Sequence, residues 1–422
     1  MDAAAEVSTG EPQQASSGDE PATPARKAGF RLLPVGDYFV DTTGSSPLHK
    51  IAGDQPGSSF LIIKAYVLAV ALTYLPLTIA AFLGPVSVFA PSATVRLPFL
   101  YDWNIAFAFL VTFPCVVAFT VSDHVALASA LFRIQRDGIL VISDADAQAL
   151  SIKWTRRFRT VNRAGFIAGA AEGCLLVVFN YIAYSTPGVG FWVSITSDHR
   201  SLMVASVFMY CIFALYSSTL FYIFRSVAIT LFLNDVVGRA QLHMLPFHPD
   251  KCGGLRPIGR FGLRNQYLLS IVGLNVVFLV IVTVSYLKVP PSLFGLVAGA
   301  SILYGLLGPI VFMGPLLSFR AAMIRTKETL LSEVAQRLRI ELRRLRKELP
   351  AGNLLQEDEE LIDRLRKVGD VIDELPVWPF DAVTMRRFLT AYGVPMVAAA
   401  LSSTQILRWA LTALQAWLNA NS

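Results

Sequence analysis

Charged residues are scarce in this chain of 422 residues: they make up 16% of it, whereas an ordinary soluble domain carries about 25%. Hydrophobic residues reach 54%, and the mean hydropathy is +0.54. So few charges cannot cover a surface that faces water, which excludes a typical cytosolic enzyme. The apolar residues gather into runs of about 20, the length that crosses a hydrocarbon core of about 30 Å. The sequence therefore predicts an all-α, polytopic membrane protein.

Cysteine is also rare, with four residues, three of which (Cys115, Cys174 and Cys211) lie inside apolar runs. This placement argues against a disulfide framework. The net charge of +6 would by its sign permit nucleic acid as a partner. The basic residues flank the apolar runs, however, so we expect the lipid bilayer as the partner and no nucleic acid.

Familiar catalytic signatures are missing as well. The chain has no Gly-x-x-x-x-Gly-Lys-Ser/Thr phosphate loop, no Gly-x-Ser-x-Gly elbow and no His-Glu-x-x-His pair. We therefore predict no enzyme activity, no cofactor and no catalytic residue. Asp123-His124 and Asp198-His199 could each supply an acid and a base. Because adjacent side chains point apart on a helix, we interpret both pairs as incidental.

The chain begins with a polar segment and continues with six apolar runs. Residues 1–59 are rich in Ala, Ser, Gly, Pro and acids and have no sustained apolar period, which is typical of a disordered tail. A six-span transmembrane domain is predicted over 60–318, because separate apolar runs satisfy their backbone groups best as helices. The runs cover 60–84, 103–122, 165–185, 201–226, 265–287 and 292–318.

The basic residues between the runs predict the orientation. The connections 123–164 and 227–264 hold seven and five Lys or Arg residues, whereas the three alternate connections hold one each. The positive-inside rule then places both ends of the six-span domain, and with them the N-terminal tail, in the cytoplasm.

A cytoplasmic helical hairpin is predicted over 319–375. Six apolar residues between Leu331 and Leu349 recur with a mean spacing of 3.6, the period of a straight amphipathic helix, and a second helix follows Pro350. Residues 319–349 contain nine bases and four acids, whereas 355–375 contain three bases and eight acids. An antiparallel hairpin would place these opposite charges side by side.

The last segment, 376–422, leaves its membrane topology open. Its apolar region is long enough to span, but Gly393, Pro395, Gln405 and Arg408 interrupt it. A seventh span or a re-entrant helical pair and an interfacial helix remain alternatives.

Glu172 is the most informative ionisable residue in an apolar run. A carboxylate about 10 Å into a membrane helix is costly unless it is paired, hydrated or protonated. The same helix carries Gly165, Gly169 and Gly173, a ridge that lets another helix approach closely. One interpretation is an ion or proton site at a helix contact. The other is a structural carboxylate, paired with Arg225 or facing a cytoplasmic vestibule.

The sixth run contains a second group of small residues and two Gly-Pro pairs. Gly295 and Gly299 form a Gly-x-x-x-Gly packing motif. Each proline removes a helix hydrogen bond, so these pairs predict either a gating hinge or a static kink. The hinge residues are Gly308, Pro309, Gly314 and Pro315.

The loop between the fourth and fifth runs contains His248-Pro-Asp-Lys-Cys-Gly-Gly-Leu255. His243, His248, Asp250 and Cys252 include metal-binding residue types, but their spacing matches no closed zinc site. We predict no metal and favour a structural loop, in which Gly253 and Gly254 adopt conformations closed to other residues.

This loop, together with Pro376-Val-Trp-Pro-Phe-Asp381, resembles two short motifs of uncharacterised bacterial multi-pass membrane proteins. The motifs are His-Pro-Asp-x-x-Gly-Gly-Leu and Trp-Pro-Phe. The resemblance implies a bacterial inner membrane and transfers no catalytic residue.

Two functions are consistent with these features. The first is a channel or transporter for a small ion or solute, with Glu172 on the path and the sixth run as the moving element. The alternative is a non-transporting signalling or scaffold protein, in which the 319–375 hairpin binds a cytoplasmic protein and the spans anchor it. The glycine ridge could also serve a homo-oligomer.

Overall fold

The computed structural model describes residues 59–397 except 93–94, 186–190, 194–198, 246–247, 286–290, 349–355, 382, 391 and 394–396. The predicted N-terminal tail and most of the predicted C-terminal membrane segment lie outside the described residues. Within the described part the chain is almost entirely helical, which confirms the all-α prediction.

The described elements are mostly long helices. The shorter elements are α3 (Ser59–Leu72), α4 (Tyr74–Leu83), the 3₁₀ turn η1 (Phe99–Tyr101), α5 (Trp103–Phe107), the π-turn η2 (Ala108–Thr112), and two strands that form a minimal antiparallel pair, β1 (Leu140–Val141) and β2 (Gln241–Leu242). The longer helices are α6 (Phe113–Arg136), α7 (Asp144–Ser185), α8 (His199–Arg239), α9 (Arg256–Ser285), α10 (Pro291–Glu348) and α11 (Gln356–Asp373).

Five helical segments are long and apolar enough to cross a membrane by length and composition. They are Ile62–Leu83, Trp103–Arg136, Asp144–Ile182, His199–Arg239 and Arg256–Val282. They match the first five predicted runs, and the sixth predicted run lies within α10. The count of six to seven spans stays a prediction.

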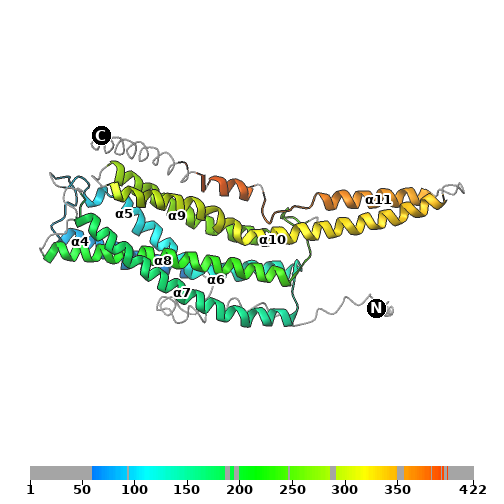
Figure 1. Cartoon of the computed structure of the whole chain (residues 1–422), viewed down its shortest axis with the longest axis horizontal. Helices are drawn as coiled ribbons and strands as arrows, with labels where there is room; N and C mark the ends of the chain where they lie inside the picture. Colours follow the sequence, from blue (N-terminus) through cyan, green and yellow to red (C-terminus); the bar gives the residue numbers. More distant parts are fainter. Residues whose placement is uncertain are drawn as a thin grey trace, which may run out of the picture.

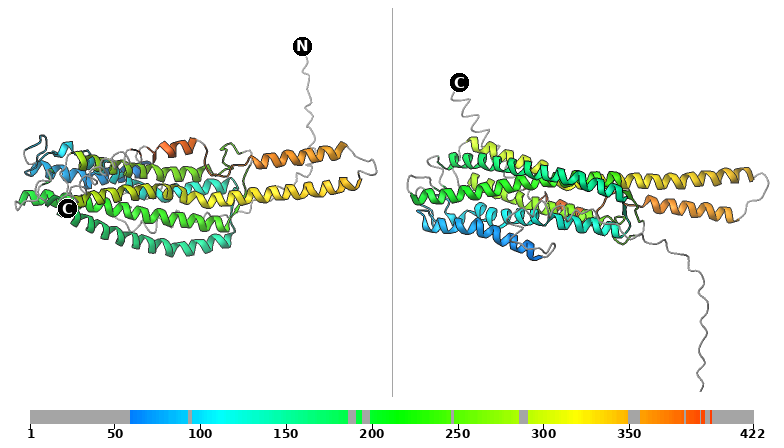
Figure 2. Two further views of the ribbon diagram at one scale, coloured as in Figure 1. Left: turned by 45° about the horizontal axis from the view of Figure 1, so that its top comes forward. Right: turned by 90° about the horizontal axis from the view of Figure 1, so that it is seen from below.

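The long helices lie roughly parallel in one elongated bundle, and α10 and α11 extend from one end of it (Figure 1, Figure 2). We call this the hairpin end and the opposite end the distal end. The main contacts are those of α7 with α8, of α10 with α9 and α8, and of α6 with α3 and α9. Because α7 packs mainly on α8, it lies at the edge of the bundle.

Several helices continue far beyond the predicted membrane runs. α7 begins at Asp144, about 20 residues before the run that starts at Gly165, and α6 continues to Arg136. Much of the expected loop 123–164 is therefore helical. α10 passes without interruption from the sixth run into the first half of the hairpin, so no break separates the two at residue 318.

Aromatic packing closes the distal end. Trp192 is 1% exposed and its ring lies 4.9 Å from that of Phe99 and 5.5 Å from that of Phe208. Its indole nitrogen donates to the Asp102 carboxylate at 3.0 Å, and Asp102 also accepts from the Ile105 backbone N–H. Asp102 thus fixes the first turn of α5 to the distal loops.

The α10–α11 pair is an antiparallel hairpin. An ideal Cβ atom on Gly369 of α11 would lie 3.8 Å from Val334 of α10, and Lys327 forms an ion pair with Asp373 at 2.9 Å. Leu345 and Ile372 are buried, but a set of apolar side chains stays largely exposed: Ile340, Leu342, Leu361 and Val368.

Candidate functional site

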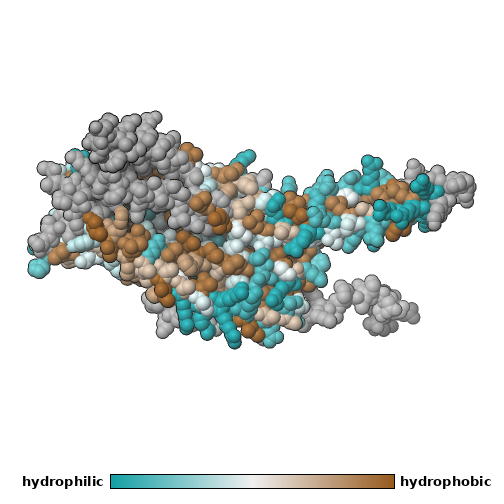
Figure 3. Space-filling model, viewed as in Figure 1, coloured by the Kyte–Doolittle hydropathy of each residue, from teal (hydrophilic) through white to brown (hydrophobic). Residues whose placement is uncertain are grey.

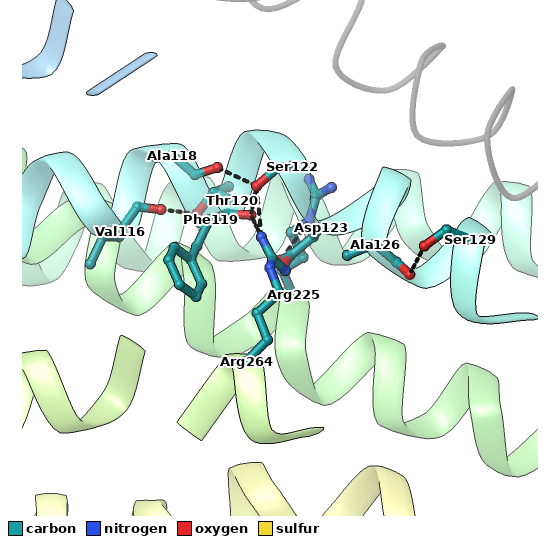
Figure 4. A network of polar contacts seen from close by, with 10 residues as sticks. All are labelled: Val116, Ala118, Phe119, Thr120, Ser122, Asp123, Ala126, Ser129, Arg225 and Arg264. Atoms are coloured by element: carbon teal, nitrogen blue, oxygen red, sulfur yellow. Dashed lines mark hydrogen bonds and ion pairs between the residues drawn. The ribbon is translucent and has the colours of Figure 1, made fainter. Parts of the chain in front are cut away.

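The most strongly buried charges meet between α6, α8 and α9 (Figure 4). Asp123 and Arg225 each have 1% of their side-chain surface exposed, and Arg264 has 21%. Arg264 Nη1 lies 2.6 Å from Asp123 Oδ1, and Arg225 Nε lies 3.7 Å from Asp123 Oδ2. The two carboxylate oxygens of Asp123 thus face arginines from two different helices. We call these three residues the charged cluster.

Arg264 is held by more than its ion pair. Its Nη2 atom donates to Ser122 Oγ at 2.6 Å and to the Phe119 carbonyl at 3.2 Å, and its guanidinium carbon lies 4.5 Å from the centre of the Phe119 ring. Phe119, Ser122 and Asp123 are spaced i, i+3 and i+4, so one face of α6 presents all three contacts. A planar guanidinium suits this combination of stacking and directed donation.

Apolar layers border the charged cluster on both sides along the bundle. Toward the distal end, Val116, Tyr222 and Leu268 are buried together. Toward the hairpin end, Leu127 and Ile229 belong to the large core of that end. The cluster thus lies between two groups of buried apolar side chains, together with several buried polar side chains of the same three helices. Removing one partner of such a buried pair costs about 3–5 kcal/mol, because a charge is left without compensation.

The structure separates Glu172 from Arg225. Glu172 lies on α7, where its neighbour Gly173 contacts Phe213 and Ser217 of α8. Arg225 is eight residues beyond Ser217, or about 12 Å along α8. The suggested Glu172–Arg225 pair is thus replaced by the Asp123–Arg225 pair. Glu172 is half-buried, and among the described residues no hydrogen-bond partner reaches its buried Oε2 atom.

The glycine ridge brings α7 close to α8 within one chain. Ideal Cβ atoms on Gly169 and Gly173 would lie 2.5 Å and 2.4 Å from the Ser217 carbonyl oxygen and Oγ, and one on Gly165 would lie 3.0 Å from Phe224 Cβ. The distances at Gly169 and Gly173 are shorter than real Cβ contacts, and the distance at Gly165 is tighter than most. A larger residue at Gly169, which faces backbone, would therefore push the two helices apart.

The proposed hinge positions lie within the continuous helix α10. Gly314 packs against α8, with its ideal Cβ position 3.1 Å from Thr230 Cγ2, and Pro315 is buried. The surroundings of Gly295, Gly299, Gly308 and Pro309 lie outside the described residues. α10 remains helical through both Gly-Pro pairs. A gating hinge at these positions stays a prediction.

In the His248–Leu255 loop, Asp250 organises the backbone. Its Oδ1 atom accepts from the N–H groups of Cys252 at 2.9 Å and Gly254 at 3.0 Å, and Oδ2 accepts from that of Arg256 at 3.1 Å. His248 Nδ1 lies 2.8 Å from Oδ1. Burial raises the pKa of Asp250, but these hydrogen bonds outweigh burial and hold the pKa below its usual value.

The two glycines of this loop meet a conformational need. Gly253 and Gly254 have φ angles of 62° and 91°, in the left-handed region, and an ideal Cβ on Gly254 would overlap Ile139 at 1.8 Å. Only glycine fits there. Within the described residues no three His, Cys, Asp or Glu side chains gather as metal ligands would. The loop is a turn that begins α9.

The two motifs of the bacterial resemblance meet at the start of α9. Arg256, the first residue of α9, donates its backbone N–H to Asp250 and pairs its side chain with Asp381 at 3.1 Å. Gly259 lies against the Pro379 carbonyl, and the Arg320 guanidinium of α10 stacks 4.5 Å above the Trp378 ring. Residues 120 positions apart thus join α9 to the base of the hairpin.

Sequence reasoning missed two members of the charged cluster. Asp123 was interpreted as incidental and Arg264 only as a loop charge, although each directly adjoins an apolar run. The sequence did hold a signal for this pairing, because Asp123 and Arg264 each lie at the cytoplasmic end of a predicted run. Their pairing across 141 residues required the tertiary structure.

Comparisons with protein-family models, curated proteins and solved structures find no match to this chain.

Proposed function

We propose that the chain is an integral membrane protein whose five apolar segments and the first part of α10 cross the bilayer, with the hairpin end in the cytoplasm. The outward faces of the helices support this location, because Phe166 and Leu175 of α7 are 71% and 69% exposed. The excess of basic residues at the hairpin end supports the orientation. A bacterial inner membrane agrees with the motif resemblance.

We further propose that the bundle passes a small anionic solute or ion. The charged cluster carries this proposal. Ionisable side chains inside a membrane bundle are costly and commonly mark a solute path. Two arginines and one aspartate give the three residues a combined charge of +1, and arginine-lined sites favour anions over cations. The path thus lies between α6, α8 and α9 rather than at Glu172.

The surrounding layers define how passage would be controlled. The buried layer of Val116, Tyr222 and Leu268 closes the cluster toward the distal end. Passage requires these side chains to separate, and an apolar constriction that opens and closes is a recognised form of gate. α9 is the natural moving element, since it carries both Arg264 and Leu268 and is packed along α10.

Flux in proteoliposomes tests this function. Purified wild-type protein should pass chloride, nitrate, phosphate or a small carboxylate, and Arg264→Gln should reduce that flux by at least about tenfold because the anion loses its counter-charge. Asp123→Asn should alter the preference among anions. Asp235→Asn is the matched control, because Asp235 of α8 pairs with Lys153 of α7, about 15 Å along α8 from Arg225.

Two outcomes would count against the proposal. Correctly folded protein that passes none of these anions would contradict it, and so would equal losses in Arg264→Gln and Asp235→Asn. Cation or proton flux that Glu172→Gln abolishes, with the cluster variants unchanged, would move the path to the α7–α8 contact.

A second candidate function is a scaffold that binds a cytoplasmic protein. The observation that favours it is the hairpin, which extends beyond the bundle and exposes Ile340, Leu342, Leu361 and Val368. Because Val334 lies beside Gly369, residues 335–368 can be replaced by a short glycine linker without straining the base. A pore should keep its flux after this deletion, whereas a scaffold should lose its partner.

A further inference from the structure

The outward face of α7 changes its chemistry abruptly along its length. Toward the hairpin end, exposed arginines occupy positions 156, 157, 159 and 163. Three residues later, Phe166 and Ile167 are 71% and 68% exposed, and exposed apolar side chains continue to Ile182. In Figure 3 the lower edge of the molecule, where α7 runs, changes from brown to teal toward the hairpin end.

The length of the apolar section of α7 indicates where the change from basic to apolar residues lies relative to the bilayer. Phe166 to the end of α7 at Ser185 is 20 residues, or about 30 Å of helix, which equals the thickness of a hydrocarbon core. This step uses the proposed membrane location but not the proposed transport. When the section fills the core, Arg163 stands at the level of the phospholipid headgroups on the cytoplasmic side.

The arginines on this face lack acidic neighbours. No Asp or Glu occurs between residues 147 and 171. Asp235, the acid on the facing part of α8, is engaged by Lys153 and Trp154. Among the described residues, no ion pair is formed by Arg156, Arg159 or Arg163. Because these three lie close to one face of the helix, they repel one another until an anion joins them.

We propose that Arg156, Arg159 and Arg163 bind the phosphate of an anionic phospholipid in the cytoplasmic leaflet. The forked guanidinium groups suit bidentate contact with phosphate oxygens. The acyl chains of the same lipid lie along Phe166, Ile167 and the apolar face beyond them. Only a molecule that is anionic at its head and apolar along its length matches both halves of this surface.

Lipid retention by the purified full chain tests the proposal. The protein is extracted in mild detergent, incubated with phosphatidylglycerol or phosphatidylethanolamine, and analysed by native mass spectrometry. We expect wild-type protein to retain phosphatidylglycerol preferentially. The triple variant Arg156→Gln, Arg159→Gln and Arg163→Gln should retain at least about fivefold less phosphatidylglycerol, with phosphatidylethanolamine unchanged.

A matched control removes the same charge elsewhere. Arg337, Arg339 and Arg343 are exposed on the part of α10 that lies beyond the bundle, so their triple change to Gln should leave lipid retention unaltered. A triple change of the α7 arginines to Lys keeps the charge but loses the forked geometry, and should give intermediate retention.

Other results would overturn the proposal. They are undiminished phosphatidylglycerol on the α7 Gln variant, an equal loss in the α10 control, and displacement of the lipid by an equal concentration of inorganic phosphate. A chain recovered from the soluble fraction would overturn the membrane location and this site together. Protein that needs detergent, binds the lipid and shows no flux would contradict only the proposed transport.

Discussion

Two carboxylates on helices that pack against α8 have opposite surroundings. Asp123 on α6 is almost fully buried and faces two arginines, whereas Glu172 on α7 is half-buried and its buried oxygen meets no hydrogen-bond donor among the described residues. The contact between α6 and α8 includes the Asp123–Arg225 ion pair, whereas the contact between α7 and α8 depends on three glycines. The comparison shows that one helix can use a polar layer on one face and close backbone contact on another.

Asp102 at the distal end is an intermediate case. It is as buried as Asp123, but its partners are the neutral N–H groups of Ile105 and Trp192 rather than arginines. The three carboxylates therefore form a series. The partners that offset the cost of burying the carboxylate weaken from Asp123, with arginines, to Asp102, with neutral N–H groups, to Glu172. The predictions below test the members of this series and the glycine contact beside Glu172.

The largest effect is expected for Asp123→Leu. This change leaves Arg225 buried without its carboxylate, so the free energy of unfolding should fall by about 3–5 kcal/mol. Chemical denaturation in detergent, followed by tryptophan fluorescence, measures the loss. Glu360→Leu is the control, and because its pair with Arg364 is largely exposed it should cost about 1 kcal/mol or less. Similar losses in the two variants would show that the buried cluster stabilises the fold no more than an exposed ion pair does.

The next largest effect is a pH dependence that arises from Asp102. Burial raises its pKa from 3.8 to about 6, although hydrogen bonds from Ile105 and Trp192 partly offset this. The folded state therefore binds the proton more tightly than the unfolded state does. Asp102 thus stabilises the fold more below pH 4, and this contribution falls by up to about 3 kcal/mol as the pH rises to 6.

The variant Asp102→Asn isolates this contribution. It removes the titration and also weakens the contact with Trp192, so its stability relative to wild type should improve between pH 4 and pH 7. Thermal unfolding of both proteins across this range measures the trend. A difference that stays constant with pH would mean that Asp102 does not titrate between these values.

A smaller loss is expected when the glycine contact is enlarged. Gly169→Ala places a methyl group 2.5 Å from the Ser217 carbonyl oxygen, so α7 must shift and the free energy of unfolding should fall by about 1–3 kcal/mol. Gly238→Ala in α8 meets no atom within 4 Å and should raise stability by up to about 1 kcal/mol. The opposite signs are the test, and a neutral Gly169→Ala would argue that α7 is loosely attached.

The smallest effect is expected for Glu172→Gln. Because an unpaired carboxylate in a membrane helix is costly, its replacement by a neutral amide should not lower the free energy of unfolding, and any change should be a gain. The same denaturation measurement applies. A loss comparable to that of Asp123→Leu would reveal a strong partner for Glu172 and would restore it as a candidate site.

The apolar runs were enough to predict the helical class and the positions of the bundle helices. Their ends were less predictable, because α7 and α10 continue as helices through polar sequence once neighbouring elements cover one face. Trp154 and Phe158, for example, are buried in the core of the hairpin end although the sequence around them is strongly basic. Hydropathy alone could not show that burial.

The sequence by itself determined local properties of this protein: long apolar helices, an amphipathic hairpin, a ridge of glycines and a turn that only glycine can complete. These follow from composition and spacing, since backbone preference and periodicity act over a few residues. Only the tertiary structure decided that Arg225 pairs with Asp123 rather than Glu172, and that Arg264 joins them. The reason is physical, because the partner of a buried charge is set by which helix faces pack together, and that depends on contacts between residues far apart in the chain.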